Sequence, residues 1–121
     1  MSKTILIVDD SMPLRKVVSI SLKGAGYEVI EAEHGQDALD KLKSSKVNLI
    51  VSDINMPVMD GIQFVTELKK IPEYKFTPVI MLTTESEVEK KEQAKAAGAR
   101  AWMNKPFKPD QMLNAVEKLM M

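Results

Sequence analysis

Four apolar stretches of the chain each end on a polar residue. They are ILIV before Asp9, NLIVS before Asp53, PVIML before Thr83 and ARAWMN before Lys105. Apolar runs of this length between turn signals are typical of buried parallel strands. The carboxyl ends of such strands lie along one edge of an open α/β sheet, where ligands bind. The pattern therefore predicts that the acids, among them Asp10, share one cleft with a hydroxyl and a lysine.

Helical patterns alternate with these strands along the whole chain. The first helix begins at Pro13, and its apolar positions recur at helical spacing: Leu14, Val17, Val18, Leu22 and Ala25. The alternation favours βαβ units with right-handed crossovers. Five strand and helix pairs fit the length, with the more polar segment EVIEA, from Glu28, as an edge strand. The sequence thus predicts an α/β fold.

The helical segment from Glu87 to Gly98 differs from the others because Val88 is its single large apolar residue. A helix with so little apolar surface gains little from packing. Two interpretations stay open. The helix either shifts its position easily, or it is a solvated helix that small residues hold in place and Gly98 ends.

Composition limits the class of protein. The 121 residues contain no linker tract, and 45% of them are hydrophobic, which is enough for a core without covalent staples. The absence of cysteine excludes disulfides, thiolate metal sites and cysteine nucleophiles. We expect a single domain over residues 1–121, without an output domain.

Charge and hydropathy limit the partners. Lys+Arg and Asp+Glu are both 17, so the chain lacks the basic excess on which nucleic-acid binding relies. The N-terminus has no pattern of a signal peptide, and no apolar run approaches the roughly 18 residues of a membrane span. We expect a cytoplasmic protein that binds no nucleic acid and does not insert into a membrane.

The acids at the strand ends indicate a metal site. Asp9 and Asp10 alone would be read as a turn and helix cap, but Asp53 at a second central strand changes the balance. Three carboxylates in one crevice repel each other unless a cation is present, and oxygen ligands without His or Cys select Mg²⁺. Lys105 could pair with a carboxylate or a phosphoryl oxygen, although a lysine at a strand end is usually only a surface residue.

Four motifs carry a family resemblance: VDDS at 8–11, SDINMPVMDG at 52–61, MLTTES at 81–86 and NKPF at 104–107. With these motifs the chain resembles the receiver domain of a two-component response regulator, and it is similar to the stand-alone CheY-type receivers of chemotaxis. The resemblance implies a doubly wound, five-stranded parallel sheet with five helices and the flavodoxin-like strand order 2-1-3-4-5.

The resemblance also implies a role for each motif residue. Asp53 would accept a phosphoryl group from a histidine kinase. Mg²⁺ would be held by Asp10, Asp53 and the backbone carbonyl of Asn55, with Asp9 acting mostly through water. Thr83 would hydrogen-bond the phosphoryl group, and Lys105 would neutralise its charge. A cis peptide bond is implied before Pro106, and Gly61 is expected to permit a turn that a Cβ would disfavour.

Further residues are implied in phosphate lifetime and signalling. Asn55 and Glu85 would lie beside the path of the hydrolytic water, and Thr84 is larger than the alanine often found after the threonine. Thr83 and Trp102 would form the switch, with Trp102 at a position where most relatives have Tyr or Phe. Without the resemblance, Trp102 would be read as a half-buried strand residue that covers the core.

The function that follows is a stand-alone response regulator, not an enzyme with a separate substrate. Its partners would be a histidine kinase, a downstream protein such as the flagellar motor switch, and a phosphatase. Alternatives are a pseudo-receiver and a phosphorelay intermediate. A haloacid-dehalogenase-like phosphatase is disfavoured because Asn55 cannot replace its second acid, and an FMN carrier because Asp9 and Asp10 would repel the phosphate.

Overall fold

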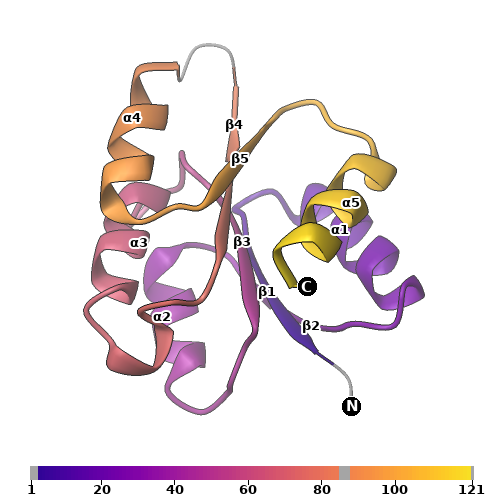
Figure 1. The fold of residues 1–121 in the computed structure, drawn as a ribbon, viewed down its shortest axis with the longest axis horizontal. Coiled ribbons are helices and arrows are strands. Elements are labelled where there is room, and N and C mark those ends of the chain that lie inside the picture. The colour runs from indigo at the N-terminus through magenta and orange to yellow at the C-terminus, as the bar shows by residue number, and fades with distance from the viewer. Residues whose placement is uncertain (1–2, 85–87, 121) are drawn as a thin grey trace.

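The computed structural model describes residues 3–84 and 88–120, and Figure 1 shows strands and helices alternating along the chain. The elements are β1 (Thr4–Val8), α1 (Met12–Gly24), β2 (Glu28–Ala32), α2 (Gly35–Leu42), β3 (Leu49–Asp53), α3 (Gly61–Leu68), the short 3₁₀ helix η1 (Pro72–Tyr74), β4 (Val79–Thr83), α4 (Val88–Ala97), β5 (Ala101–Asn104) and α5 (Pro109–Met120). The α/β fold predicted from the alternation is confirmed.

The five strands form one parallel sheet in the order β2-β1-β3-β4-β5. This is the order that the family resemblance implied. β2 lies at an edge, as its polar residues predicted, while every residue of β3 and β4 is buried. Because all strands are parallel, their carboxyl ends meet at the same edge of the sheet.

Helices cover both faces of the sheet. Figure 1 shows α1 and α5 on one side, and α2, α3 and α4 on the other. Buried side chains form a cluster on each side, with Leu6 and Phe64 in one and Ile5 and Leu22 in the other. None of the helices in the described part of the chain is long and apolar enough to cross a membrane.

The predicted apolar face of α1 is partly wrong. Val17 is 51% exposed, whereas Arg15, Val18, Ser19 and Leu22 are buried. These four positions follow the i, i+3, i+4, i+7 spacing of one helix face. The prediction of Val18 and Leu22 is confirmed, whereas Arg15 and Ser19 were missed because a search for apolar periodicity does not find polar residues on a buried face.

Helix α4 is described from Val88 to Ala97, and Glu87, at which the predicted segment begins, lies outside the described residues. Ala94 is fully buried, and Gly98 ends the helix with φ +121 and donates its N–H to the Ala94 carbonyl. A glycine in this left-handed conformation is a common helix end. Small-residue packing agrees with the second interpretation of this helix, while its ease of movement stays a prediction.

Candidate functional site

An acidic cluster lies at the carboxyl edge of the two central strands. Asp9 directly follows β1, and Asp53 is the last residue of β3. Asp9, Asp10 and Asp53 can each offer one carboxylate oxygen, and these oxygens lie within 4.8 Å of one another. Asp9 and Asp53 are buried, whereas Asp10 is exposed. The structure thus brings together the three acids that the strand pattern predicted.

Asp9 is held on several sides. Its Oδ1 accepts a hydrogen bond from the Ser11 N–H at 2.8 Å, and its Oδ2 lies 3.4 Å from the Lys105 ammonium. Its backbone N–H donates to the Ala32 carbonyl at 3.1 Å. These bonds fix the first acid and the start of the turn into α1.

Asp53 is a buried carboxylate among charges. Its Oδ1 accepts from the Ile54 N–H at 2.9 Å, and its Oδ2 pairs with the Lys105 ammonium at 3.1 Å. Burial of the carboxyl, followed by repulsion from the Asp9 carboxylate, raises the pKa of Asp53 from its ordinary 3.8 to about 6, although Lys105 opposes this rise. Ionisation of Asp53 therefore costs free energy unless a positive charge in addition to that of Lys105 lies nearby.

Lys105 follows β5 and reaches both buried acids. Burial of its ammonium opposes the charged form, but the carboxylates of Asp53 and Asp9 outweigh burial and raise the pKa of Lys105. The peptide bond between Lys105 and Pro106 is cis, which is the geometry that the resemblance implied. Lys105 thus stays positively charged beside the buried carboxylate of Asp53.

The acids fit a hard divalent cation. All three offer carboxylate oxygens, and the repulsion from Asp9, which adds to burial in raising the pKa of Asp53, indicates that a further positive charge beside Lys105 would stabilise the ionised cluster. Mg²⁺ is bound in proteins by one or two carboxylates together with waters and phosphate oxygens. Asp9, Asp10 and Asp53 are therefore the residues that would hold Mg²⁺.

The remaining predicted residues lie on β4 and β5 or directly after β4. Thr83 is fully buried at the end of β4, and its hydroxyl donates to Oδ1 of Asn104 at 3.1 Å. Thr84 follows and is half-buried. Trp102 lies on β5 opposite Met81 and is 39% exposed. The ring is thus open to solvent, on the strand whose last residue accepts the Thr83 hydrogen bond.

Two residues were predicted to affect phosphate lifetime. Asn55 is exposed on the loop after β3, and its Oδ1 accepts from the Lys90 ammonium of α4 at 2.7 Å. This link between the loop and α4 was not predicted, because nothing in the sequence pairs an exposed lysine with an amide 35 residues away. Glu85 lies outside the described residues.

The loop between β3 and α3 brings its backbone close to Asp53. A Cβ on Gly61 would lie 2.1 Å from the Asp53 carbonyl oxygen, so a side chain is disfavoured here, as predicted, and the cause is the close approach of the backbone. Val58, in the same loop, has φ +67 and is 77% exposed. A β-branched residue in this region is a conformational outlier.

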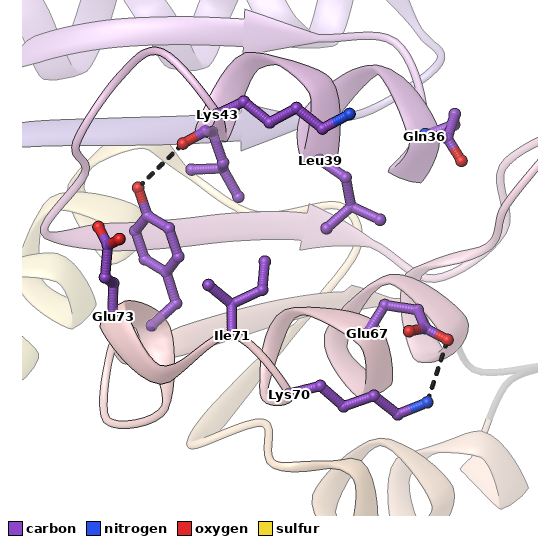
Figure 2. Close-up of a pocket in the computed structure, with 9 residues that line it drawn as sticks. Gln36, Leu39, Lys43, Glu67, Lys70, Ile71 and Glu73 are labelled. Atoms are coloured by element: carbon purple, nitrogen blue, oxygen red, sulfur yellow. Dashed lines mark hydrogen bonds and ion pairs between the residues drawn. The ribbon is translucent and has the colours of Figure 1, made fainter.

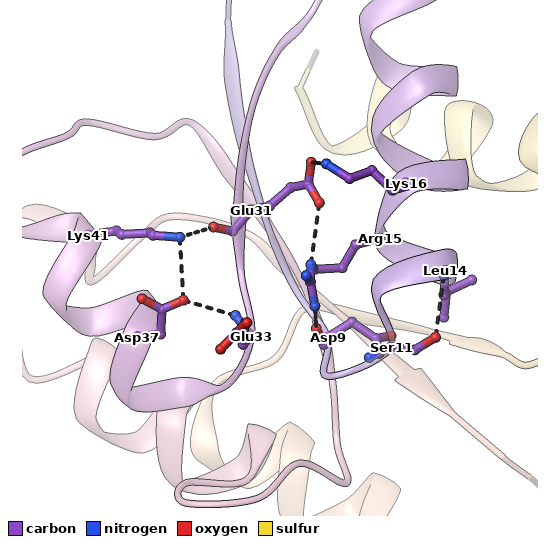
Figure 3. Close-up of polar contacts among 9 residues, drawn as sticks. All are labelled: Asp9, Ser11, Leu14, Arg15, Lys16, Glu31, Glu33, Asp37 and Lys41. Atoms are coloured by element: carbon purple, nitrogen blue, oxygen red, sulfur yellow. Dashed lines mark hydrogen bonds and ion pairs between the residues drawn. The ribbon is translucent and has the colours of Figure 1, made fainter.

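Arg15 is a residue of the site that the sequence analysis missed. Figure 3 shows its guanidinium between the Asp9 turn and Glu31 of β2. Its Nη1 donates to the Asp9 backbone carbonyl at 2.6 Å, and its Nε lies 3.3 Å from Oε1 of Glu31. The signal was a charged residue at i and apolar residues at i+3 and i+7, Val18 and Leu22, which place it on the buried face of α1.

A separate cavity of about 440 Å³ lies between α2, α3 and η1. In Figure 2, Leu39 and Ile71 point into this cavity, while Lys43, Glu67 and Lys70 lie around its rim. None of its lining residues belongs to the acidic cluster. The cavity is therefore not part of the candidate site.

Comparison with known proteins agrees with the geometry. A family model described as "Response regulator receiver domain" matches residues 5–117. The structure is similar to that of the chemotaxis response regulator CheY4 of Vibrio cholerae, with a TM-score of 0.93, 44% identity, and coverage of 98% of this chain and 99% of that one.

Two sequence relatives come from Pseudomonas aeruginosa. The phosphate regulon transcriptional regulatory protein PhoB is 39% identical over 92% of this chain, and the protein PilG is 34% identical over 93% of it. The match covers 48% of PhoB and 84% of PilG, so the chain spans about half the length of the first of these relatives.

Proposed function

This chain belongs to the response regulator receiver family of two-component systems, and on that premise we propose that it accepts a phosphoryl group on Asp53 and signals through another protein. The observation that carries the proposal is the Asp53 carboxylate, buried at the end of a central strand beside two further acids and 3.1 Å from Lys105.

In the proposed reaction an Asp53 carboxylate oxygen attacks phosphorus. The donor is a phosphohistidine of a kinase or a small acyl phosphate. An oxygen–phosphorus bond forms, and the bond from phosphorus to the leaving group breaks, with the bonding pair going to the leaving group. The Ile54 N–H holds one oxygen of Asp53, which orients the carboxylate for attack.

The other residues of the site stabilise the transferred group. The Lys105 ammonium, already paired with Asp53, would donate to a phosphoryl oxygen and offset its charge. The Thr83 hydroxyl would exchange its bond to Asn104 for one to the phosphoryl group. Mg²⁺, when bound, supplies positive charge that offsets the repulsion between the acids and the phosphoryl oxygens. The chain then takes part in its own phosphorylation and turns over no separate substrate.

The experiment that tests this proposal is intact-protein mass spectrometry. The wild type is incubated with acetyl phosphate, with and without Mg²⁺, beside Asp53→Asn and Asp60→Asn. Asp60 is a matched control because it is a nearby acid that caps α3 through the Gln63 N–H and lies outside the cluster. We expect one Mg²⁺-dependent phosphoryl adduct in the wild type and in Asp60→Asn. An adduct of full yield in Asp53→Asn would refute the acceptor assignment.

We further propose a chemotaxis-type output in the cytoplasm, with a histidine kinase upstream, a flagellar motor switch protein downstream, and a phosphatase that ends the signal. The near-complete overlap with CheY4 supports this pathway. Because the chain also matches PhoB and PilG, other pathways stay alternatives to chemotaxis, including a phosphorelay.

Binding of a purified flagellar switch protein, with and without phosphorylation, tests the output. We expect tighter binding after phosphorylation and no change in Asp53→Asn. Equal binding in both states would contradict the proposed signal. Transfer of the phosphoryl group from Asp53 to a histidine phosphotransfer domain would instead favour the phosphorelay intermediate.

A further inference from the structure

Arg15 is a buried cation next to the acidic cluster, yet it pairs with none of the three clustered carboxylates. Its side chain is 10% exposed. Its guanidinium donates to the Asp9 backbone carbonyl at 2.6 Å and contacts Glu31 at 3.3 Å, as Figure 3 shows. The Glu31 carboxylate also pairs with Lys16 at 3.1 Å. The arginine is thus held by Glu31 of β2 on one side and by the Asp9 backbone carbonyl on the other.

The carbonyl that Arg15 holds belongs to the peptide group between Asp9 and Asp10. A peptide group is planar, so fixing its carbonyl limits the direction in which the Cα–Cβ bond of Asp10 leaves the backbone. The Asp9 side chain has its own bonds to Ser11 and Lys105. Among the described residues, the Asp10 carboxylate accepts no hydrogen bond. Its direction therefore depends on the backbone that Arg15 holds.

The contact with Glu31 leaves the acids free to bind a cation. Burial opposes ionisation of Glu31, but its pairs with Lys16 and Arg15 lower the pKa of this carboxyl. Glu31 thus stays negatively charged, and it neutralises the positive charge of Arg15 in place of the clustered acids. As a result, the arginine adds a rigid support for the turn without occupying an oxygen of Asp9, Asp10 or Asp53.

We propose that Arg15 is a positioning residue that sets the Mg²⁺ affinity by fixing the Asp9–Asp10 peptide, and with it the direction of the Asp10 carboxylate. This inference rests on the proposed function, because it assumes that the cluster binds Mg²⁺. Partners that orient metal ligands typically change metal affinity 10- to 100-fold when they are removed.

The variant that tests the inference must keep the local charge. Removing Arg15 alone would leave an extra negative charge near the cluster, and this charge would strengthen Mg²⁺ binding and mask a loss of positioning. We therefore choose the double variant Arg15→Met/Glu31→Gln, which removes one charge of each sign. Mg²⁺ affinity is measured by isothermal titration calorimetry at a temperature where urea unfolding shows that the variant is folded.

We expect the double variant to bind Mg²⁺ about tenfold more weakly than the wild type. Lys16→Met is the matched control, because Lys16 pairs with the same Glu31 but is exposed, so that solvent screens the loss of its charge, and in the described part of the chain it makes no hydrogen bond or ion pair with the Asp9–Asp10 turn. Its affinity should equal that of the wild type within about twofold. If the double variant fails to fold, Arg15→Lys takes its place, because it keeps the charge but lacks the fork that reaches both partners.

A double-mutant cycle distinguishes positioning from general loosening. In an Asp10→Asn background, the Arg15/Glu31 change should reduce Mg²⁺ affinity much less than in the wild type, because the carboxylate through which Arg15 acts is already missing. Equal losses in both backgrounds, or a double variant with wild-type affinity, would overturn the positioning role of Arg15 but not the metal site. A wild type that binds no Mg²⁺ would overturn the metal site of the proposed function as well.

Discussion

At the scale of single residues, Asp53 carries an energetic cost that its chemistry requires. Burial and the Asp9 charge raise its pKa from 3.8 to about 6, so the folded protein holds the proton more tightly than the unfolded chain does. The contribution of Asp53 to the free energy of unfolding of the metal-free wild type should therefore fall as pH rises from about 4 to about 6. Above that range the contribution of Asp53 stays constant.

Asp53→Asn removes this cost. We expect the metal-free variant to be more stable than the wild type by about 1–2 kcal/mol at pH 7, after allowing for the lost pair with Lys105. Urea unfolding at a series of pH values measures both effects. The advantage should shrink as the pH falls and vanish below about pH 3, where the wild-type carboxyl is protonated in both states. An advantage independent of pH would show that ionisation of Asp53 is not its cause.

Val58 presents a second local cost, in the loop that leads away from Asp53. Its φ of +67 disfavours any residue with a Cβ, by about 1–2 kcal/mol, and its side chain is exposed and contributes little packing. We expect Val58→Gly to raise the free energy of unfolding by about 1 kcal/mol, net of the greater flexibility of glycine in the unfolded chain. Val58→Ala should recover less. A destabilised Val58→Gly variant would indicate that the valine side chain makes a contact that outweighs the strain.

At the scale of elements, the junction between β3 and α3 depends on Gly61. Its missing Cβ leaves room for the Asp53 carbonyl oxygen, which would otherwise lie 2.1 Å away. We expect Gly61→Ala to lower the free energy of unfolding by about 1–3 kcal/mol, as overpacking does, and to lower the rate of adduct formation from acetyl phosphate. Both measurements report the same displacement of the Asp53 backbone.

Gly24→Ala is the control for this change. A Cβ on Gly24, the last residue of α1, would meet nothing within 4 Å. This variant should be as stable as the wild type or slightly more stable, because alanine is the better helix former. A Gly61→Ala variant that matched it in stability and adduct formation would contradict the close approach.

The elements themselves could be predicted from the sequence, for a physical reason. The runs ending at Asp9 and Asp53 are buried on both faces of the sheet, so their apolarity is continuous and easy to detect. The face of α1 was harder to predict, because the buried Arg15 makes polar contacts with Asp9 and Glu31, which are 6 and 16 residues away along the chain. A search for apolar periodicity finds buried apolar residues, but it does not find a buried charged residue that makes polar contacts.

At the scale of the whole molecule, Mg²⁺ binding and folding should be coupled. A ligand that binds only the folded state stabilises it by about 2.7 kcal/mol at a hundred times its dissociation constant. Below pH 6 the Asp53 carboxyl holds a proton that must leave before the oxygen can bind metal. We therefore expect Mg²⁺ to raise the thermal midpoint clearly at pH 8 and only slightly at pH 5. Equal shifts at the two pH values, at matched ionic strength, would contradict an Asp53 ligand.

The site could be predicted only as far as strand ends and motifs define it. Parallel strands bring Asp9 and Asp53 together whatever the loops do, so these acids follow from the strand pattern. The contact between Lys90 and Asn55 and the one between Arg15 and the Asp9 carbonyl depend on side-chain directions of helices packed over the sheet. Spacing in the sequence can place Arg15 on the buried face of α1, but it does not specify the partners that either side chain reaches.

The parallel register has a consequence for labelling the protein. All chemistry lies at one edge of the sheet, while the turn carrying Phe76, which is 83% exposed, leads into the opposite end of β4. A strand of five residues puts about 16 Å between the two ends. Because the chain contains no cysteine, one introduced at Phe76 would be the single attachment point for a dye or a surface linker. Such a tether would immobilise the molecule with its acidic edge facing the solution.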